Sequence, residues 1–170
     1  MWYVIQVQAC HELAVVDRCQ GIVKDEEEVF TMLSEQMERK NGEWQVIRSV
    51  AFQKYIFVDT ANIDGFRVRL HSIPGMTRIL TVGDDAVPIY PKEEKLLRLL
   101  GGKDHIIGRS VVYKEGDKVT VISGALVGLE GLVRWTDKRQ RWIGIAVSLA
   151  DRETVIKLGA EFVRPDEKKP

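Results

Sequence analysis

The stretch GDKVTVISGALVGLEGLV, residues 116–133, decides the fold of the C-terminal part of the chain. Val119 and Val121 alternate with other residues at the period of a half-buried strand. A second strand begins at Leu132, and three glycines interrupt the apolar pattern before it: Gly124, Gly128 and Gly131. Glycine fits here because a tight reversal and a close backbone approach need φ angles or clearances that a Cβ forbids. The stretch therefore predicts a strand, a glycine-rich loop and a returning strand, which can open a small β-barrel or form an isolated hairpin.

The three glycine spacings with their flanking valines resemble the KOW motif of NusG-type transcription factors and some ribosomal proteins. The resemblance implies a small, SH3-like KOW β-barrel, which we place at residues 112–165. The last five residues, DEKKP at 166–170, are expected to form a frayed tail.

The composition is that of a folded protein with one domain or two small ones. The chain has 170 residues, of which 45% are hydrophobic and 29% are charged. Its 25 basic and 25 acidic residues cancel, so net charge alone indicates neither nucleic-acid nor membrane binding. Residues 1–105 hold 13 basic and 16 acidic residues, whereas residues 106–170 hold 12 and 9. A polyanion is therefore expected to prefer the C-terminal part.

Targeting and metal-binding signals are missing from the sequence. No apolar run is long enough to span a bilayer, and the N-terminus lacks a basic flank with a hydrophobic core, so we expect a cytoplasmic protein with no membrane partner. Cys10 and Cys19 are the only cysteines, too few for a disulfide framework. No CxxC occurs and the histidines are scattered, so we expect neither a structural metal nor a cofactor.

The first hundred residues alternate between predicted strands and helices. Asn41-Gly42 suits the positive φ angles of a type I′ hairpin turn. Asn62 can cap a helix, and Pro91 can begin another that Gly101-Gly102 ends. The predicted strands are 2–7, 29–33, 37–40, 43–46, 50–58 and 77–82, and the predicted helices are 13–19, 63–70 and 91–100. This order predicts an α+β fold, with a sheet flanked by helices.

Several segments resemble the N-terminal (NGN) domain of the NusG family. The resemblance implies an NGN-like antiparallel sheet with flanking helices at residues 1–101. Glycine and charge at residues 102–111 predict a flexible linker, in which Ile106-Ile107 could pack against either domain. The similar segments are WYVIQVQACHE at 2–12, the aromatic strand at 52–58, the Pro-Gly loop at 71–77 and the closing segment at 86–91, with a C-terminal match at 152–158.

The aromatic strand carries the residues that the resemblance places against RNA polymerase. In the family it helps to form an apolar pocket that grips the clamp helices of the polymerase, a contact that needs exposed aromatic side chains. Phe52 and Tyr55 match these positions, with Lys54 beside them, and Phe57 is expected in the core. Tyr55 and Phe57 would point the same way and Phe52 oppositely, unless a bulge intervenes. The family's Pro-Gly is replaced by Gln53-Lys54, which puts the local geometry in question.

The loop after the second predicted helix is a candidate for contact with DNA. In the family, polar residues at this place face the non-template DNA strand of the transcription bubble. His71 and Ser72 are the matching positions here. Ile73 offers no hydrogen bond, so weak or altered DNA readout is expected.

A basic and aromatic segment, residues 134–142, lies between two predicted strands of the barrel. Cations attract the phosphate backbone and tryptophan can stack on unpaired bases, so RNA binding is one interpretation. The other is an exposed hairpin tip with each tryptophan folded back on the barrel. The candidate RNA-binding residues are Arg134, Trp135, Lys138, Arg139, Arg141 and Trp142, with Arg152 and Lys157 as extensions of the same patch.

No pattern predicts an enzyme. Cys10-His11 is the only possible nucleophile–base pair, but neighbouring residues rarely face each other. Glu26-Glu27-Glu28 is interpreted as a solvated loop rather than a metal site. The sequence contains no glycine-rich phosphate loop.

The resemblance implies a transcription elongation factor that binds RNA polymerase through the NGN domain. Within the family, the replaced Pro-Gly and the basic segment favour a specialised LoaP-like antiterminator that reads a leader RNA hairpin. An RfaH-like factor whose barrel refolds into helices is disfavoured by the strand-forming valines. One alternative is a general NusG factor whose barrel binds a ribosomal protein or a termination factor. Another is a ribosome-associated RNA-binding protein, which the N-terminal resemblance and the neutral charge disfavour.

Overall fold

The computed structural model describes residues 1–75 and 77–164, so the expected tail at 166–170 lies outside the described residues. The N-terminal elements are β1 (Trp2–Gln6), α1 (Glu12–Cys19), β2 (Glu28–Phe30), β3 (Leu33–Lys40), β4 (Glu43–Val50), β5 (Tyr55–Asp59), α2 (Ile63–Leu70), β6 (Arg78–Ile79), β7 (Thr81–Val82), β8 (Asp85–Ala86) and α3 (Pro91–Gly101). The C-terminal elements are β9 (Ile106–Ile107), β10 (Ser110–Glu115), β11 (Lys118–Gly124), the 3₁₀ turn η1 (Glu130–Leu132), β12 (Val133–Asp137), β13 (Trp142–Leu149) and β14 (Arg152–Val163).

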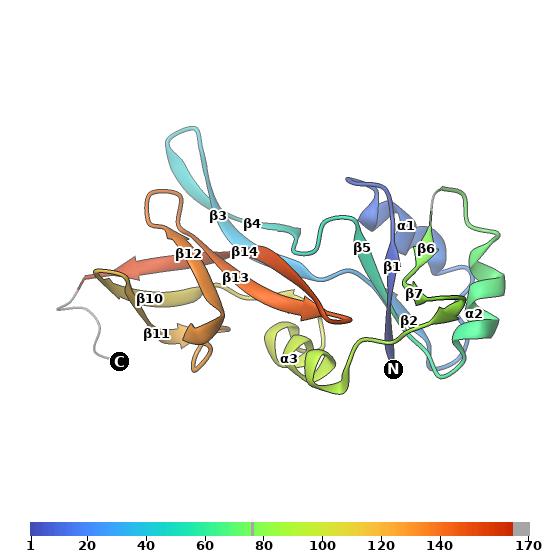
Figure 1. Ribbon diagram of the computed structural model, residues 1–170. Coiled ribbons are helices and arrows are strands. Elements are labelled where there is room, and N and C mark those ends of the chain that lie inside the picture. The colour runs from blue at the N-terminus through green and yellow to red at the C-terminus, as the bar shows by residue number, and fades with distance from the viewer. Residues whose placement is uncertain (76, 165–170) are drawn as a thin grey trace.

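The fold is α+β, as predicted, and the molecule is elongated (Figure 1). A helix-flanked sheet lies at one end and the β10–β14 barrel at the other, with α3 below the region where they meet. The β3–β4 hairpin leaves the N-terminal part and runs alongside the barrel. Among the described residues, no helix is long and apolar enough to cross a membrane.

The N-terminal sheet has the order β2-β5-β1-β6, and all of its pairs are antiparallel, which confirms the predicted sheet. Its side chains alternate between two faces. Ile5 and Ile56 belong to a buried cluster with residues of α1 and α2. Trp2 and Phe57 belong to a second cluster that continues into the barrel. One face of the sheet therefore packs against α1 and α2, and the other face packs against the rest of the molecule.

Three local signals in the sequence are confirmed. Asn41 and Gly42 have φ angles of 52° and 80°, as the turn between β3 and β4 requires. The Asn62 side chain accepts a hydrogen bond from the Gly65 N–H at 2.9 Å and caps α2. Helix α3 begins at Pro91 and is followed by Gly102 at a φ of 61°.

Three predicted strands are interrupted. The strand predicted at 50–58 is wrong between β4 and β5. The chain turns at residues 51–54, where Lys54 has a φ of 71°, outside the β region. The strand predicted at 77–82 is divided into β6 and β7, which lie in different sheets. Residues 29–33 likewise hold the end of β2 and the start of β3 rather than one strand.

The C-terminal part is a five-stranded barrel with the order β11-β10-β14-β13-β12, in which only the β10–β14 pair is parallel. The glycine-rich stretch supplies β11, the loop with η1, and the start of β12. Gly124 has a φ of 100°, and a Cβ there would clash with the backbone of Arg109 and Ser110. The backbone approach expected from the sequence thus occurs at this glycine.

The segment expected to be a flexible linker is packed instead. Strand β9 pairs in parallel with β3, and Ile107 is completely buried. Strand β3 also crosses β14, where the Ser34 hydroxyl and the Gln36 side-chain amide donate to the Lys157 carbonyl at 3.2 and 3.1 Å. One hydrophobic cluster therefore extends from the N-terminal sheet into the barrel. Packing of Ile106-Ile107 against a domain, the alternative left open by the sequence, is therefore what occurs.

Candidate binding sites

The aromatic residues predicted to contact a partner are less exposed than expected. Phe52 has no exposed surface, and its ring meets that of Phe57 edge-on at 5.6 Å between centroids. Tyr55 is half-buried against the same cluster, whereas Lys54 is exposed. The expectation that Phe52 is an exposed anchor is wrong for this structure, because the turn before β5 directs it to the same side as Phe57.

Hydrogen bonds at both the N–H and the carbonyl of Lys54 hold the turn before β5, although Gln53-Lys54 replaces the family's Pro-Gly pair. Lys54 takes the left-handed φ that glycine would adopt, so the replacement retains the turn. The Lys54 N–H donates to the buried carboxylate of Glu12 at 2.8 Å, and its carbonyl accepts from the Val7 N–H at 2.8 Å. These bonds offset part of the cost of a left-handed lysine, about 1 kcal/mol or more.

The candidate DNA-contacting residues lie at the C-terminal end of α2. His71 and Ser72 are exposed, and the Ser72 hydroxyl donates to the Arg69 carbonyl at 2.8 Å. Sequence reasoning missed Arg67 and Arg78, which line a cavity of about 280 Å³ with His71. The two cations come from different elements, α2 and β6, so only the fold brings them together.

Both tryptophans of the basic segment are folded back on the barrel. The Trp135 ring covers Gly144, where a Cβ would clash with it, and 39% of Trp135 remains exposed. The Trp142 ring is half-buried and carries the Lys157 ammonium group at 3.6 Å from its centroid. Stacking of bases on freely projecting indoles is therefore not what this arrangement offers.

The cations of the segment do not all lie together. Lys138 and Arg139 are exposed at the turn between β12 and β13, which we call the barrel tip (residues 138–141). Arg134 lies at the other end of β12 and donates to the Gly131 carbonyl at 2.9 Å. Arg152 pairs with Leu149, seven residues along β13 from Trp142, which corresponds to about 23 Å. Arg152 therefore lies apart from the barrel tip, and its place in a wider RNA-binding patch stays a prediction.

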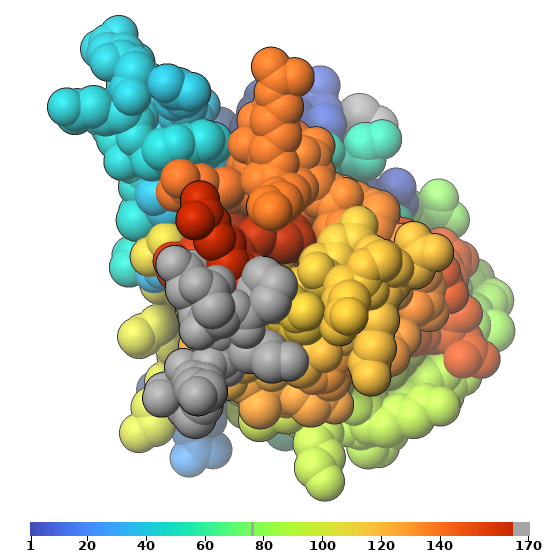
Figure 2. Space-filling view, turned by 90° about the vertical axis from the view of Figure 1, so that its left-hand side faces the viewer, coloured from blue at the N-terminus to red at the C-terminus, as the bar shows by residue number. Residues whose placement is uncertain are grey.

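A second hairpin lies beside the barrel tip. The Arg141 guanidinium lies over the Trp44 ring of β4 at 4.1 Å, which joins the β3–β4 hairpin to the tip. Figure 2 shows these two hairpins, in cyan and orange, projecting from the same end of the molecule. The tip thus presents Lys138 and Arg139 to solvent, with Arg141 fixed behind them.

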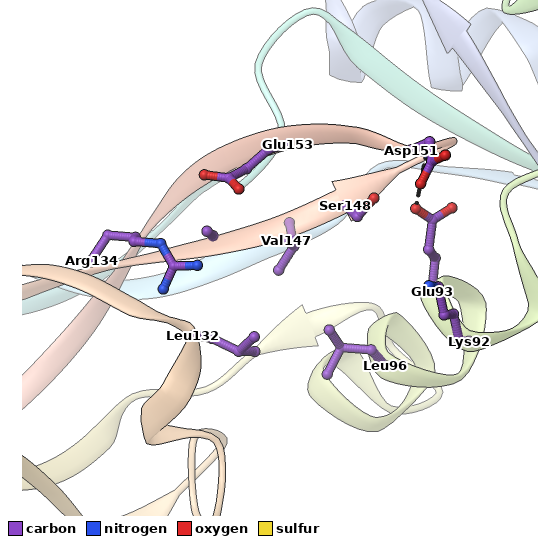
Figure 3. A pocket seen from close by; sticks show the side chains of 10 residues that line it. Lys92, Glu93, Leu96, Leu132, Arg134, Val147, Ser148, Asp151 and Glu153 are labelled. Carbon is purple, nitrogen blue, oxygen red and sulfur yellow. Dashed lines mark hydrogen bonds between the residues drawn. The ribbon is translucent and has the colours of Figure 1, made fainter.

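An open pocket of about 390 Å³ lies between helix α3 and the barrel (Figure 3). Leu96 of α3, Leu132 and Val147 form its apolar lining. At one end the carboxylate of Glu93 points at the turn between β13 and β14, where it accepts a hydrogen bond from the Asp151 N–H at 3.2 Å. Glu93 is buried, with 4% of its surface exposed. Sequence reasoning missed this contact, since 57 residues or more separate its partners.

A buried carboxylate within the N-terminal part has a charged partner instead. Glu27 accepts from two nitrogens of the Arg69 guanidinium, at 2.7 and 2.9 Å, and from the Thr60 hydroxyl at 2.7 Å. Chiefly because of the bonds from Arg69, its pKa is lowered to about 2. The pair fixes α2 to the loop before β2.

The fold defines a class of two-part protein, in which a helix-flanked antiparallel sheet is joined to a small β-barrel. Cys10 is exposed, and His11 only precedes α1 without a capping bond from its side chain. In residues 1–75 and 77–164, no group of three His, Cys, Asp or Glu side chains could hold a metal ion.

The chain belongs to the NusG family of transcription termination and antitermination factors. The sequence profile of the family described as "Transcription termination factor nusG" matches residues 1–98, more than half of the chain.

Relatives with similarity over most of the chain bear the name "Transcription termination/antitermination protein NusG". The protein of Thermus thermophilus is 27% identical over 71% of this chain and 70% of its own length. Those of Campylobacter jejuni and Bacillus subtilis are each 24% identical, over 92% of both chains and over 98% and 97% respectively. A solved structure titled "Domain interaction in Thermotoga maritima NusG" matches with a TM-score of 0.52 and 18% identity, over 93% of this chain and 92% of that one. It supports the two-part fold.

Proposed function

We propose that this protein is a specialised, LoaP-like antitermination factor. Its N-terminal part would bind the clamp helices of RNA polymerase, and its barrel would bind an RNA hairpin in the leader of the operons it controls. Such a factor works in the cytoplasm, where the transcript is made.

The observation that carries the RNA part of this proposal is the barrel tip. Lys138 and Arg139 are exposed, and Arg141 is held beside them by Trp44. Lys157 adds a cation on the neighbouring strand, over Trp142. Cations on a projecting turn suit the closely spaced phosphates of a folded RNA.

The packing of the two tryptophan rings against the barrel favours structured RNA over single strands. Trp135 and Trp142 lie on the barrel, so they support the cations rather than project as stacking platforms. Double-stranded RNA is recognised mainly through its shape, its phosphates and its 2′-hydroxyl groups. A hairpin stem therefore fits this surface better than unpaired bases do.

The contact with polymerase would use the turn before β5. Tyr55 is half-buried and Lys54 is exposed, so both are accessible in part, while Phe52 supports them from the core. The cavity beside His71, with Arg67 and Arg78, would meet the phosphates of the non-template DNA strand.

A general NusG factor is the second candidate, favoured by the match to relatives over nearly their full length. In that case the barrel would bind a ribosomal protein or a termination factor. The remaining candidate, a ribosome-associated RNA-binding protein, is disfavoured by the family match of the N-terminal part.

The test is binding of the full chain to a leader RNA hairpin and to an unpaired RNA of the same length, across a salt series. Lys138→Ala and Arg139→Ala should each weaken hairpin binding about tenfold and reduce the salt slope by about one. Arg152→Ala is the matched control, because Arg152 lies at the far end of β14.

Hairpin-selective binding that only the tip variants lose would support the specialised factor. Weak binding to both RNAs, equal in all variants, would contradict it and favour the general factor.

A further inference from the structure

One face of the β3–β4 hairpin carries a cation but no acid near its turn. Side chains alternate between the two faces along each strand, and residues that pair across the strands share a face. Arg39 pairs with Trp44, and Met37 pairs with Val46, so these four side chains emerge on the same side. We call this side the Trp44 face.

The acidic residues near the turn lie on the opposite face. Glu38 belongs to that face, as does Lys40, which pairs directly with Glu43. Toward the base of the hairpin, Glu35 lies on the Trp44 face, but it forms an ion pair with Arg48 at 3.5 Å. The outer part of the Trp44 face therefore holds a positive charge that no neighbouring carboxylate neutralises.

Two arginines from the barrel side reach the same face. Arg141 lies over the Trp44 ring at 4.1 Å, and the exposed Arg109, just before β10, donates to the Met37 sulfur at 3.1 Å. Within residues 1–75 and 77–164, neither of them forms an ion pair, and nor does Arg39. Three guanidinium groups thus gather on the Trp44 face, and we call them the arginine cluster (Arg39, Arg109 and Arg141).

The hydrogen-bond donors of the cluster are available to a ligand. A guanidinium that stacks on a ring uses its planar surface, so the N–H groups of Arg141, which lie in that plane, can still donate. A thioether sulfur is only a weak acceptor, so it engages Arg109 weakly. Guanidinium groups bind phosphate through two parallel hydrogen bonds. A phosphate group is therefore a ligand that the cluster suits.

The cluster continues the positive charge of the barrel tip. Lys138 and Arg139 are exposed in the same turn as Arg141. Figure 2 shows the two hairpins, in cyan and orange, standing apart at their ends with a hollow between them. Cations on both walls of a hollow suit a ligand whose negative charges repeat along its length, as they do in a nucleic-acid backbone.

We propose that the arginine cluster is a second phosphate-binding site, which contacts the backbone of the same RNA stem that the barrel tip binds. Trp44 is a positioning residue in this site, because its ring orients the Arg141 guanidinium. The identity of the ligand, a base-paired RNA stem, rests on the proposed function. The β3–β4 hairpin and the barrel thus contact one stem together.

The test compares neighbouring cations on the two faces of the hairpin. The full chain and its variants are titrated with the leader RNA hairpin across a salt series. Arg39→Ala and Arg109→Ala should each weaken binding about tenfold and reduce the salt slope by about one. Lys40→Ala is the matched control, because Lys40 is exposed and adjacent to Arg39 but lies on the opposite face. It should leave the affinity nearly unchanged.

A second set of variants separates stacking from charge. Trp44→Ala removes the ring under Arg141 but no charge, so the affinity should fall while the salt slope stays the same. Trp44→Phe keeps an aromatic surface and should restore most of the affinity. Arg141→Lys keeps the charge but loses the planar group, so it should weaken binding as well.

Equal losses of affinity in Arg39→Ala and Lys40→Ala would overturn the cluster, because a general effect of charge would explain both. Full affinity in Arg39→Ala and Arg109→Ala, with a loss in Lys138→Ala, would overturn it too, but the proposed function would stand. A loss in Arg39→Ala without a loss in Lys138→Ala would support the cluster and contradict the role of the barrel tip. Weak binding by the unaltered chain, equal to that of every variant, would overturn both proposals.

Discussion

The two regions predicted to bind partners differ in how far they are open to solvent. The aromatic segment around Phe52 lies against the rest of the molecule, and Phe52 itself is fully buried. The barrel tip projects, with Lys138 and Arg139 exposed. A charged turn is therefore available to a partner in the folded chain. An aromatic side chain packs against apolar neighbours, and a partner can contact only the part of it that these neighbours leave exposed.

The largest expected effect is on the free energy of unfolding, which should fall on mutation of the aromatic segment but hardly change on mutation of the barrel tip. Phe52→Ala should lower the free energy of unfolding by about 3–5 kcal/mol, because it leaves a cavity in a packed core. Lys138→Ala should change it by less than about 0.5 kcal/mol, because its side chain is exposed. Urea denaturation of both variants measures this. A loss for Phe52→Ala of the same small size would show that Phe52 is an exposed contact residue after all.

The second prediction concerns Glu27, which stabilises the N-terminal part without touching either region. Glu27→Gln should lower the free energy of unfolding by about 2 kcal/mol at neutral pH, since it removes charged hydrogen bonds to Arg69. Because folding lowers the pKa of Glu27 to about 2, its contribution is present above the ordinary carboxyl pKa of 4.5 and is lost as pH falls toward 2.

Denaturation at a series of pH values measures this contribution. The unaltered chain should lose stability between those two values more steeply than Glu27→Gln does, with Glu26→Gln as an exposed control. Parallel pH curves for all three proteins would contradict the assignment.

The smallest expected effect concerns the turn that positions the aromatic segment. Lys54→Gly should raise the free energy of unfolding by up to about 1 kcal/mol, because Lys54 has a positive φ that glycine adopts without strain. Gln53→Gly, next to it, should lower stability by about 0.5–1 kcal/mol through the entropy of the unfolded chain. Thermal denaturation compares them, and destabilisation by Lys54→Gly would contradict the account of this turn.

Local signals made much of the fold predictable from the sequence. The Asn41-Gly42 turn, the Asn62 cap and the Pro91 helix start depend on neighbouring residues alone, and all three are confirmed. The glycine spacing of residues 116–133 likewise pointed to the barrel strands.

Contacts between distant segments were not predictable in this way. Phe52 is buried in a cluster that includes barrel residues nearly a hundred positions away, and β9 is ordered by pairing with β3. Arg152 follows the basic segment closely in sequence, but an antiparallel strand carries it to the far end of the barrel. The cations and tryptophans of the barrel were identified from composition, but their orientation depends on the fold.

The most direct test of the account is a titration of the full chain with a leader RNA hairpin in the absence of polymerase. Lys138 and Arg139 are exposed at the barrel tip, so the RNA should bind without polymerase. Lys138→Ala should reduce the affinity about tenfold, whereas Arg152→Ala, at the other end of β14, should leave it unchanged. RNA binding that requires polymerase, or that Lys138→Ala leaves unchanged, would contradict the claim that the tip is available in the folded chain.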